Sequence, residues 1–90
     1  MGNRKKEEPD LETILDILRR ATPNLQTRTG YFPMFELAVV VSMTMLIEKG
    51  VIWEVAKVEA AIKELGHREN APVLLGIDSM GRPYNFRFRI

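Results

Sequence analysis

Residues 73–90 read VLLGIDSMGRPYNFRFRI and contain the clearest strand pattern of the chain. From residue 84 to residue 90, large apolar side chains alternate with polar ones. The apolar set is Tyr84, Phe86, Phe88 and Ile90, and the polar set is Asn85, Arg87 and Arg89. Because successive side chains of a strand point to opposite faces, this alternation predicts a strand with one apolar and one polar face. Residues 78–81 are typical of a turn and residues 73–77 form a second apolar run, so the stretch predicts an antiparallel β-hairpin.

Two segments before the hairpin have the spacing of amphipathic helices. In residues 10–21 the apolar side chains recur three or four positions apart, and Asp10 can accept a hydrogen bond from a free backbone N–H of the first turn. Residues 53–65 have the same spacing, and Gly66 suits the position that closes a helix. Residues 25–32 are a connection, in which alternating side chains leave a short strand open as an alternative.

Residues 33–49 carry conflicting signals. Pro33 suits the first position of a helix, and Gly50 suits the left-handed residue that closes one. Three consecutive valines and a short stretch with a period of two are instead typical of a strand. We predict a helix, with a strand over residues 37–47 as the alternative. Such a helix is apolar nearly all round, so it is either central to the core or half of an oligomer interface.

The composition predicts one folded domain. With 46% hydrophobic and 28% charged residues, the chain has the balance of a globular protein and not of a disordered one. A chain of 90 residues is also too short to build two independent cores. Residues 1–9 are polar and end at Pro9, so we predict a flexible tail there. For residues 10–90 we predict an α+β fold, in which three helices are followed by a C-terminal antiparallel β-hairpin.

Composition also excludes or disfavours several classes of protein. The chain contains no cysteine, which excludes disulfides, thiolate metal sites and thiol nucleophiles. The longest apolar run, residues 35–47, is shorter than the roughly 20 residues needed to cross a bilayer. The charged first residues are followed by no apolar segment typical of a secretory signal, so we expect a cytoplasmic protein. The formal net charge of +1 argues neither for nor against a nucleic-acid partner.

The sequence contains no recognisable catalytic arrangement. His67 is the only histidine, and no residues suited to share a metal ion with it, or to act as its nucleophile, are grouped nearby. The carboxylates form no pair in an evidently apolar setting. Gly76 and Gly81 lie around a hairpin turn, which is not the strand-to-helix setting of a phosphate-binding loop. We therefore expect no enzyme activity, no metal ion and no cofactor.

Two sets of residues remain as candidates for binding. The first is basic and consists of Arg82 beside the hairpin turn and Arg87 and Arg89 on the polar face of the last strand. Arginine binds phosphates well, but a charged exposed strand also prevents edge-to-edge pairing, and both interpretations stay open. The second set is apolar and predicts a homodimer or a heteromeric protein partner. It consists of Phe35, Val39, Met43, Trp53, Phe86 and Phe88, although Trp53 can instead pack in the core.

The order of predicted elements over residues 10–90 resembles the winged-helix family of DNA-binding domains. The resemblance implies that residues 53–65 are the recognition helix, with Lys57 and Lys63 facing duplex DNA, and that residues 78–83 are the tip of the wing. The same helix also carries three acidic residues, Glu54, Glu59 and Glu64. Here the sequence departs from a DNA-reading helix, because carboxylates repel phosphates. A winged-helix shape that binds protein is therefore the alternative.

A second resemblance is shorter. Residues 45–52, MLIEKGVI, and residues 58–62, VEAAI, look like the helix-Glu-Lys-Gly-helix segment of nitrile hydratase and thiocyanate hydrolase subunits. The resemblance covers residues 45–71 and implies a subunit or accessory chain of a larger enzyme. The metal-binding cysteines of that family are absent, so no hydratase activity is implied.

Together these patterns predict a small non-catalytic domain that binds a macromolecule. A winged-helix-type DNA-binding transcription regulator is the first expectation. The alternative is a protein-interaction or accessory subunit that uses the apolar helix over residues 33–49 and the hairpin face.

Overall fold

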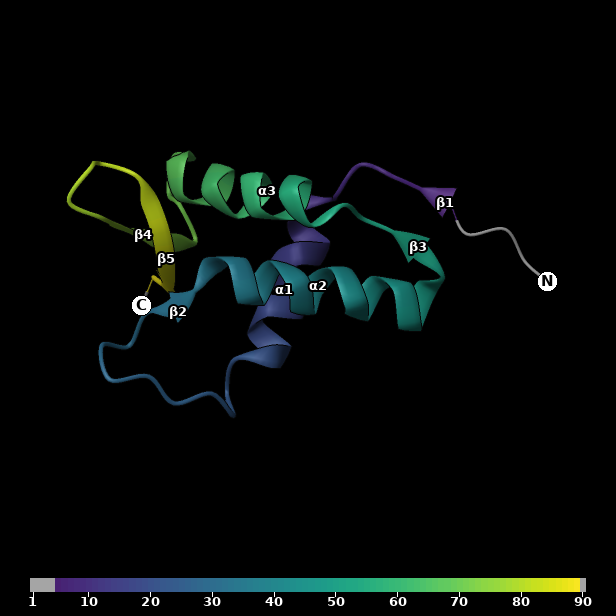
Figure 1. The fold of residues 1–90 in the computed structure, drawn as a ribbon, viewed down its shortest axis with the longest axis horizontal. Coiled ribbons are helices and arrows are strands. Elements are labelled where there is room, and N and C mark those ends of the chain that lie inside the picture. Colours follow the sequence, from purple (N-terminus) through teal and green to yellow (C-terminus); the bar gives the residue numbers. More distant parts are fainter. Residues whose placement is uncertain (1–4, 90) are drawn as a thin grey trace.

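Three helices and a three-stranded antiparallel sheet make up most of the computed structural model, which describes residues 5–89 (Figure 1). The elements follow in the order β1 (Lys5–Lys6), α1 (Leu11–Ala21), β2 (Phe32–Pro33), α2 (Met34–Lys49), β3 (Val51–Ile52), α3 (Val55–His67), β4 (Val73–Ile77) and β5 (Pro83–Phe88). The α+β prediction is therefore confirmed, and residues 37–47 are helical. Residues 1–4 of the expected tail and Ile90 of the expected last strand lie outside the described residues.

The sheet has the strand order β2-β5-β4, so the last strand of the chain is its central strand. The predicted hairpin is present as β4 and β5, with Val73 opposite Phe88 and an irregularity in register after Gly76. The alternating residues 27–31, for which the sequence leaves a short strand open, are not in a strand, but β2 begins directly after them, where Phe32 pairs with Phe86. Because β2 leads directly into α2, this pairing attaches the start of α2 to the sheet.

Side-chain and backbone caps fix two of the predicted helix ends. The Asp10 carboxylate accepts a hydrogen bond from the backbone N–H of Thr13 at 2.9 Å, as expected for the first turn of α1. Gly50 follows α2 with a left-handed φ of 68°, and its N–H donates to the Leu46 carbonyl at 3.1 Å. Both ends depend on contacts within a few residues, which explains why the sequence predicted them.

The bounds of α3 differ from the prediction. The helix begins at Val55 and continues through Gly66 to His67, while the left-handed residue beyond it is Asn70, with a φ of 54°. Gly66 is needed for packing and not for closing the helix, because a Cβ at this position would collide with the side chain of Leu75 on β4. The absence of a side chain thus lets α3 approach the sheet closely.

The core lies between the three helices and the inner face of the sheet. Phe86 is 0% exposed. The centroid of its ring lies 5.7 Å from that of Phe32 and 5.9 Å from that of Phe88. Trp53 is 3% exposed and belongs to the same core cluster. The prediction that Trp53 and Phe86 lie at a protein interface is therefore wrong for this fold, because both side chains already pack inside the domain.

Residues 5–9 also depart from the expected tail. Strand β1 pairs in parallel with β3, with Lys6 opposite Ile52, and the Glu7 N–H donates to the Ile52 carbonyl at 3.1 Å. Figure 1 shows this strand pair at one end of α2 and α3 and the hairpin at the other end. No pattern in the sequence predicts this pairing, because a two-residue strand has no detectable period.

Candidate functional site

The hairpin tip is organised around the carboxylate of Asp78. This carboxylate accepts hydrogen bonds from the backbone N–H groups of Met80 and Arg82, both at 2.9 Å. These bonds, led by the one from the Arg82 backbone, lower the pKa of Asp78. The Arg82 guanidinium lies 3.6 Å from the same carboxylate. The cation expected to contact phosphate at the tip therefore already has an acidic neighbour in its own chain.

The other two basic residues of the hairpin occupy different settings on β5. The Arg87 guanidinium lies over the ring of Tyr31, 5.5 Å from the ring centroid, and its side chain is exposed. The Nε of Arg89 donates to the Ala71 carbonyl at 2.7 Å and so connects the end of β5 to the loop before β4. Arg89 has a structural partner, while Arg87 remains accessible.

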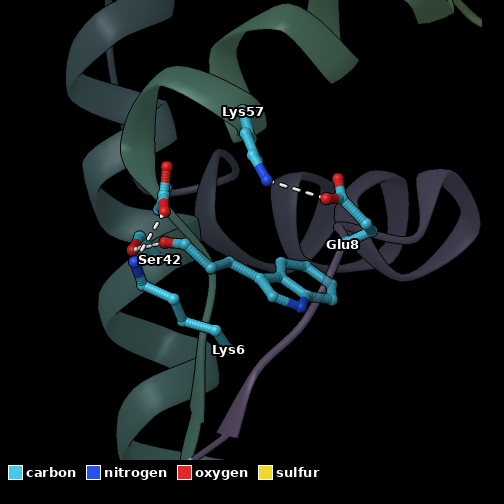
Figure 2. A network of polar contacts seen from close by, with 6 residues as sticks. Lys6, Glu8, Ser42 and Lys57 are labelled. Atoms are coloured by element: carbon cyan, nitrogen blue, oxygen red, sulfur yellow. Dashed lines mark hydrogen bonds and ion pairs between the residues drawn. The ribbon is translucent and has the colours of Figure 1, made fainter.

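Lys57, the first basic residue expected on the recognition helix, is engaged by the N-terminal segment. Its Nζ lies 2.7 Å from the Glu8 carboxylate, and Figure 2 shows the two side chains pointing toward one another. This contact raises the pKa of Lys57. The Nζ of Lys6 lies 2.9 Å from the Glu54 carboxylate. The hydrogen bond from Lys6 lowers the pKa of the Glu54 carboxyl. The start of α3 is thus covered by paired charges.

Lys63, the second basic residue expected on the recognition helix, lies farther along α3. Its side chain is half-buried and forms no ion pair with any of residues 6–89. Figure 1 shows that α3 runs from the β1–β3 pair toward the hairpin, so Lys57 and the hairpin arginines lie toward opposite ends of the helix. The five predicted cations therefore do not form one continuous basic surface.

A hollow with a volume of about 740 Å³ lies between residues 8–12 and α3. Its lining includes the carboxylates of Glu8, Asp10, Glu12 and Glu64 and the cations of Lys57 and Arg68. The carboxyl of Asp10 has a lowered pKa because the hydroxyl and the backbone N–H of Thr13 both donate to it. An excess of carboxylates on this flank of α3 disfavours the approach of phosphates.

A partly buried hydrogen bond connects α2 to the segment just before α3. The hydroxyl of Ser42 donates to the Trp53 carbonyl, as shown in Figure 2. The indole Nε1 of Trp53 has no hydrogen-bond partner among the described residues. The tryptophan therefore contributes apolar packing between α2, β3 and α3 and is not available as a platform for a ligand.

The exposed side of α2 is largely apolar, with the exposed Glu36 at its start. Phe35 is 57% exposed, Met43 is 55% exposed and Ile47 is 77% exposed. Val40 is also exposed and Val39 is half-buried, and together these five residues are called the apolar α2 face. Its accessible members follow helical spacing, since residues 40, 43 and 47 are three and four positions apart.

The structure brings part of the second predicted set together on this face. Phe35, Val39 and Met43 belong to it, whereas Phe88 is half-buried and packs against the core from β5. Sequence reasoning missed Val40 and Ile47, although their spacing from Met43 was a usable signal. They were missed because α2 is apolar on all sides, so its pattern does not show which side faces the core.

None of the helices that the structure describes is long and apolar enough to cross a membrane. Nowhere between residues 5 and 89 do three His, Asp or Glu side chains gather in a way that could hold a metal ion. The sequence matches no protein-family model, and no curated protein or solved structure is significantly similar to it.

Proposed function

We propose that this chain is a non-catalytic domain that associates with protein through the apolar α2 face. The observation that carries the proposal is the exposure of Phe35, Met43 and Ile47 on a single helix. Large apolar side chains grouped on one surface are typical of interaction sites, since burying each one contributes about 1.5–3 kcal/mol. A second copy of the chain is the simplest partner, because an isologous dimer needs only one such surface.

The charges at the two ends of α2 support an antiparallel arrangement of two copies. Glu36 lies in the first turn and Lys49 in the last, and neither forms an ion pair with another described residue. Antiparallel packing of two α2 helices would place the Glu36 end of one against the Lys49 end of the other. This arrangement would also oppose the helix dipoles favourably.

The association can be tested with Met43→Glu combined with Ile47→Glu. Each change places a charge on the apolar α2 face, where burial in an interface would be costly. We expect the unchanged chain to double in molar mass as its concentration rises, and the double variant to stay monomeric. Light scattering on a gel-filtration eluate measures both masses.

A matched control is Ala56→Glu combined with Ala60→Glu, at two exposed positions of α3 that are also four residues apart. This control adds the same charge elsewhere and should leave the association unchanged. A monomeric mass for the unchanged chain at about millimolar concentration, or equal masses for the two double variants, would contradict self-association through α2.

Binding of duplex DNA is the second candidate function, and the topology favours it. A helix, a short strand, two helices and a hairpin follow one another, and the short strand pairs with the last strand. This arrangement supports the winged-helix resemblance of the sequence. Arg82, Arg87 and Arg89 are all exposed on the hairpin, but Arg89 donates to the Ala71 carbonyl, so Arg82 and Arg87 are the cations that could reach a DNA backbone.

The DNA candidate predicts a specific dependence on salt. Each phosphate contact releases counterions, so replacing both Arg82 and Arg87 by alanine should reduce the slope of log affinity against log salt by about 2. Fluorescence anisotropy with a labelled duplex of about 20 base pairs measures that slope. Arg19→Ala with Arg20→Ala, on exposed positions of α1, is the control. Binding no better than background at about 50 mM salt would exclude this function.

A further inference from the structure

A second hollow lies where the start of α2 meets the sheet, and it is distinct from the 740 Å³ hollow beside α1. Its volume is about 420 Å³, which is within the range of small-molecule and side-chain sites. Three segments distant in the sequence form it, namely residues 31–36 from the connection through β2 to the first turn of α2, one position of α3, and the start of β5. It is called the aromatic hollow and is lined by Tyr31, Pro33, Phe35, Glu36, Glu59, Pro83, Tyr84 and Asn85.

The aromatic rings of this hollow are accessible. Phe35 is 57% exposed and Tyr84 is 55% exposed, and they come from α2 and β5. Tyr31 already forms a cation–π contact within the chain, because the Arg87 guanidinium lies 5.5 Å from its ring centroid. Cations are attracted to such ring faces by about 0.5–1 kcal/mol at exposed sites and by more when water is excluded.

The charges in the hollow are unbalanced in favour of carboxylates. Glu36 and Glu59 both line it, and neither lies within ion-pair distance of a cation among residues 6–89. Arg87 stacks on Tyr31, and Lys63 lies one turn farther along α3 than Glu59. The hollow therefore offers two open acceptors beside exposed aromatic rings.

We propose that the aromatic hollow binds an arginine side chain from an extended, basic segment of a partner protein. A guanidinium is planar, so it can stack on Phe35 or Tyr84 while its N–H groups donate to a carboxylate. Acidic segments and nucleic-acid phosphates are disfavoured, because Glu36 and Glu59 repel them. The two lining prolines give the hollow rigid walls, since the proline ring fixes the backbone φ. This site differs from the association proposed for α2 but shares Phe35 and Glu36 with it.

The test uses the full ¹⁵N-labelled chain and a capped peptide, Gly-Pro-Arg-Pro-Gly. We expect ¹H–¹⁵N shift changes concentrated at the residues that line the hollow, with binding in about the millimolar range. Peptides with citrulline or glutamate in place of the arginine are the probes of charge. Citrulline keeps the shape of arginine without its charge, so its peptide should bind at least about tenfold more weakly.

Two double variants complete the experiment. Glu36→Gln with Glu59→Gln keeps the size of both side chains and should weaken binding of the arginine peptide about tenfold or more, since hydrogen bonds between charged groups are the strong ones. Glu12→Gln with Glu64→Gln removes the same charge from the other hollow and should leave binding unchanged. Resonances outside the hollow that match those of the unchanged chain verify the fold of each variant.

The contribution of the rings is tested at one position of the hollow. Tyr84→Ala should weaken binding of the arginine peptide about threefold, and Tyr84→Phe should preserve it, because stacking needs a ring and not the hydroxyl. The proposal is overturned if the arginine peptide causes no shifts at the hollow, if the citrulline peptide binds equally well, or if the variant lacking Glu36 and Glu59 binds with unchanged affinity. The same titration on the Met43→Glu, Ile47→Glu variant separates these outcomes from self-association through α2, because that variant is expected to stay monomeric.

Discussion

Phe86→Ala should lower the free energy of unfolding by about 3–5 kcal/mol, the usual cost of emptying a buried aromatic site. Phe86 is 0% exposed, and its ring packs beside Phe32 of β2 and Phe88 of its own strand. Its loss would leave a cavity between the sheet and the helices, since the surrounding structure relaxes only in part. Small domains have a total stability of about 5–15 kcal/mol, so this variant would lose a large part of it.

Urea unfolding followed by the fluorescence of Trp53 measures this loss, because the chain contains a single tryptophan and that residue is buried. Tyr84→Ala is the matched control, since it removes an aromatic ring two residues earlier on the same strand. Tyr84 is 55% exposed, so we expect a cost below about 1 kcal/mol. If the two variants have similar stability, Phe86 is not the packing centre that the fold implies.

Gly76→Ala should destabilise the domain by about 1–3 kcal/mol, which is the usual cost of overpacking. A Cβ at residue 76 would collide with the side-chain oxygen of Asn85 on the facing strand. It would also lie 3.3 Å from the ring of Tyr31, which leaves little room for the Asn85 side chain to move away. The glycine is therefore required by the neighbouring strand, because Gly76 does not have a positive φ.

A double-mutant cycle tests this explanation. Asn85→Ala removes the colliding oxygen, which is buried and has no hydrogen-bond partner among the described residues, so this change alone should cost little. In the chain that carries both changes, most of the penalty of Gly76→Ala should be relieved. Chemical denaturation of the four proteins gives the coupling energy. Strictly additive costs would show that Asn85 is not what excludes a side chain at residue 76.

Much of the candidate site could not be predicted from the sequence. Lys57 and Arg82 were expected to meet phosphate, but each lies beside a carboxylate of its own chain. The partner of Lys57 is Glu8, which is 49 positions away in the sequence. The aromatic hollow likewise combines residues from three separate segments, 31–36, 59 and 83–85. Ion pairs and hollows of this kind depend on how elements pack, and no local pattern contains that information.

The sequence by itself determined the elements whose signals are local. The alternation of apolar and polar residues in 84–90 predicted the hairpin, Asp10 predicted the start of α1, and Gly50 predicted the end of α2. Only the tertiary structure decided which apolar side chains are buried, since Phe86 and Trp53 lie in the core while Met43 remains exposed. The physical reason is that period and capping depend on neighbouring residues, whereas burial depends on which distant surface each side chain meets.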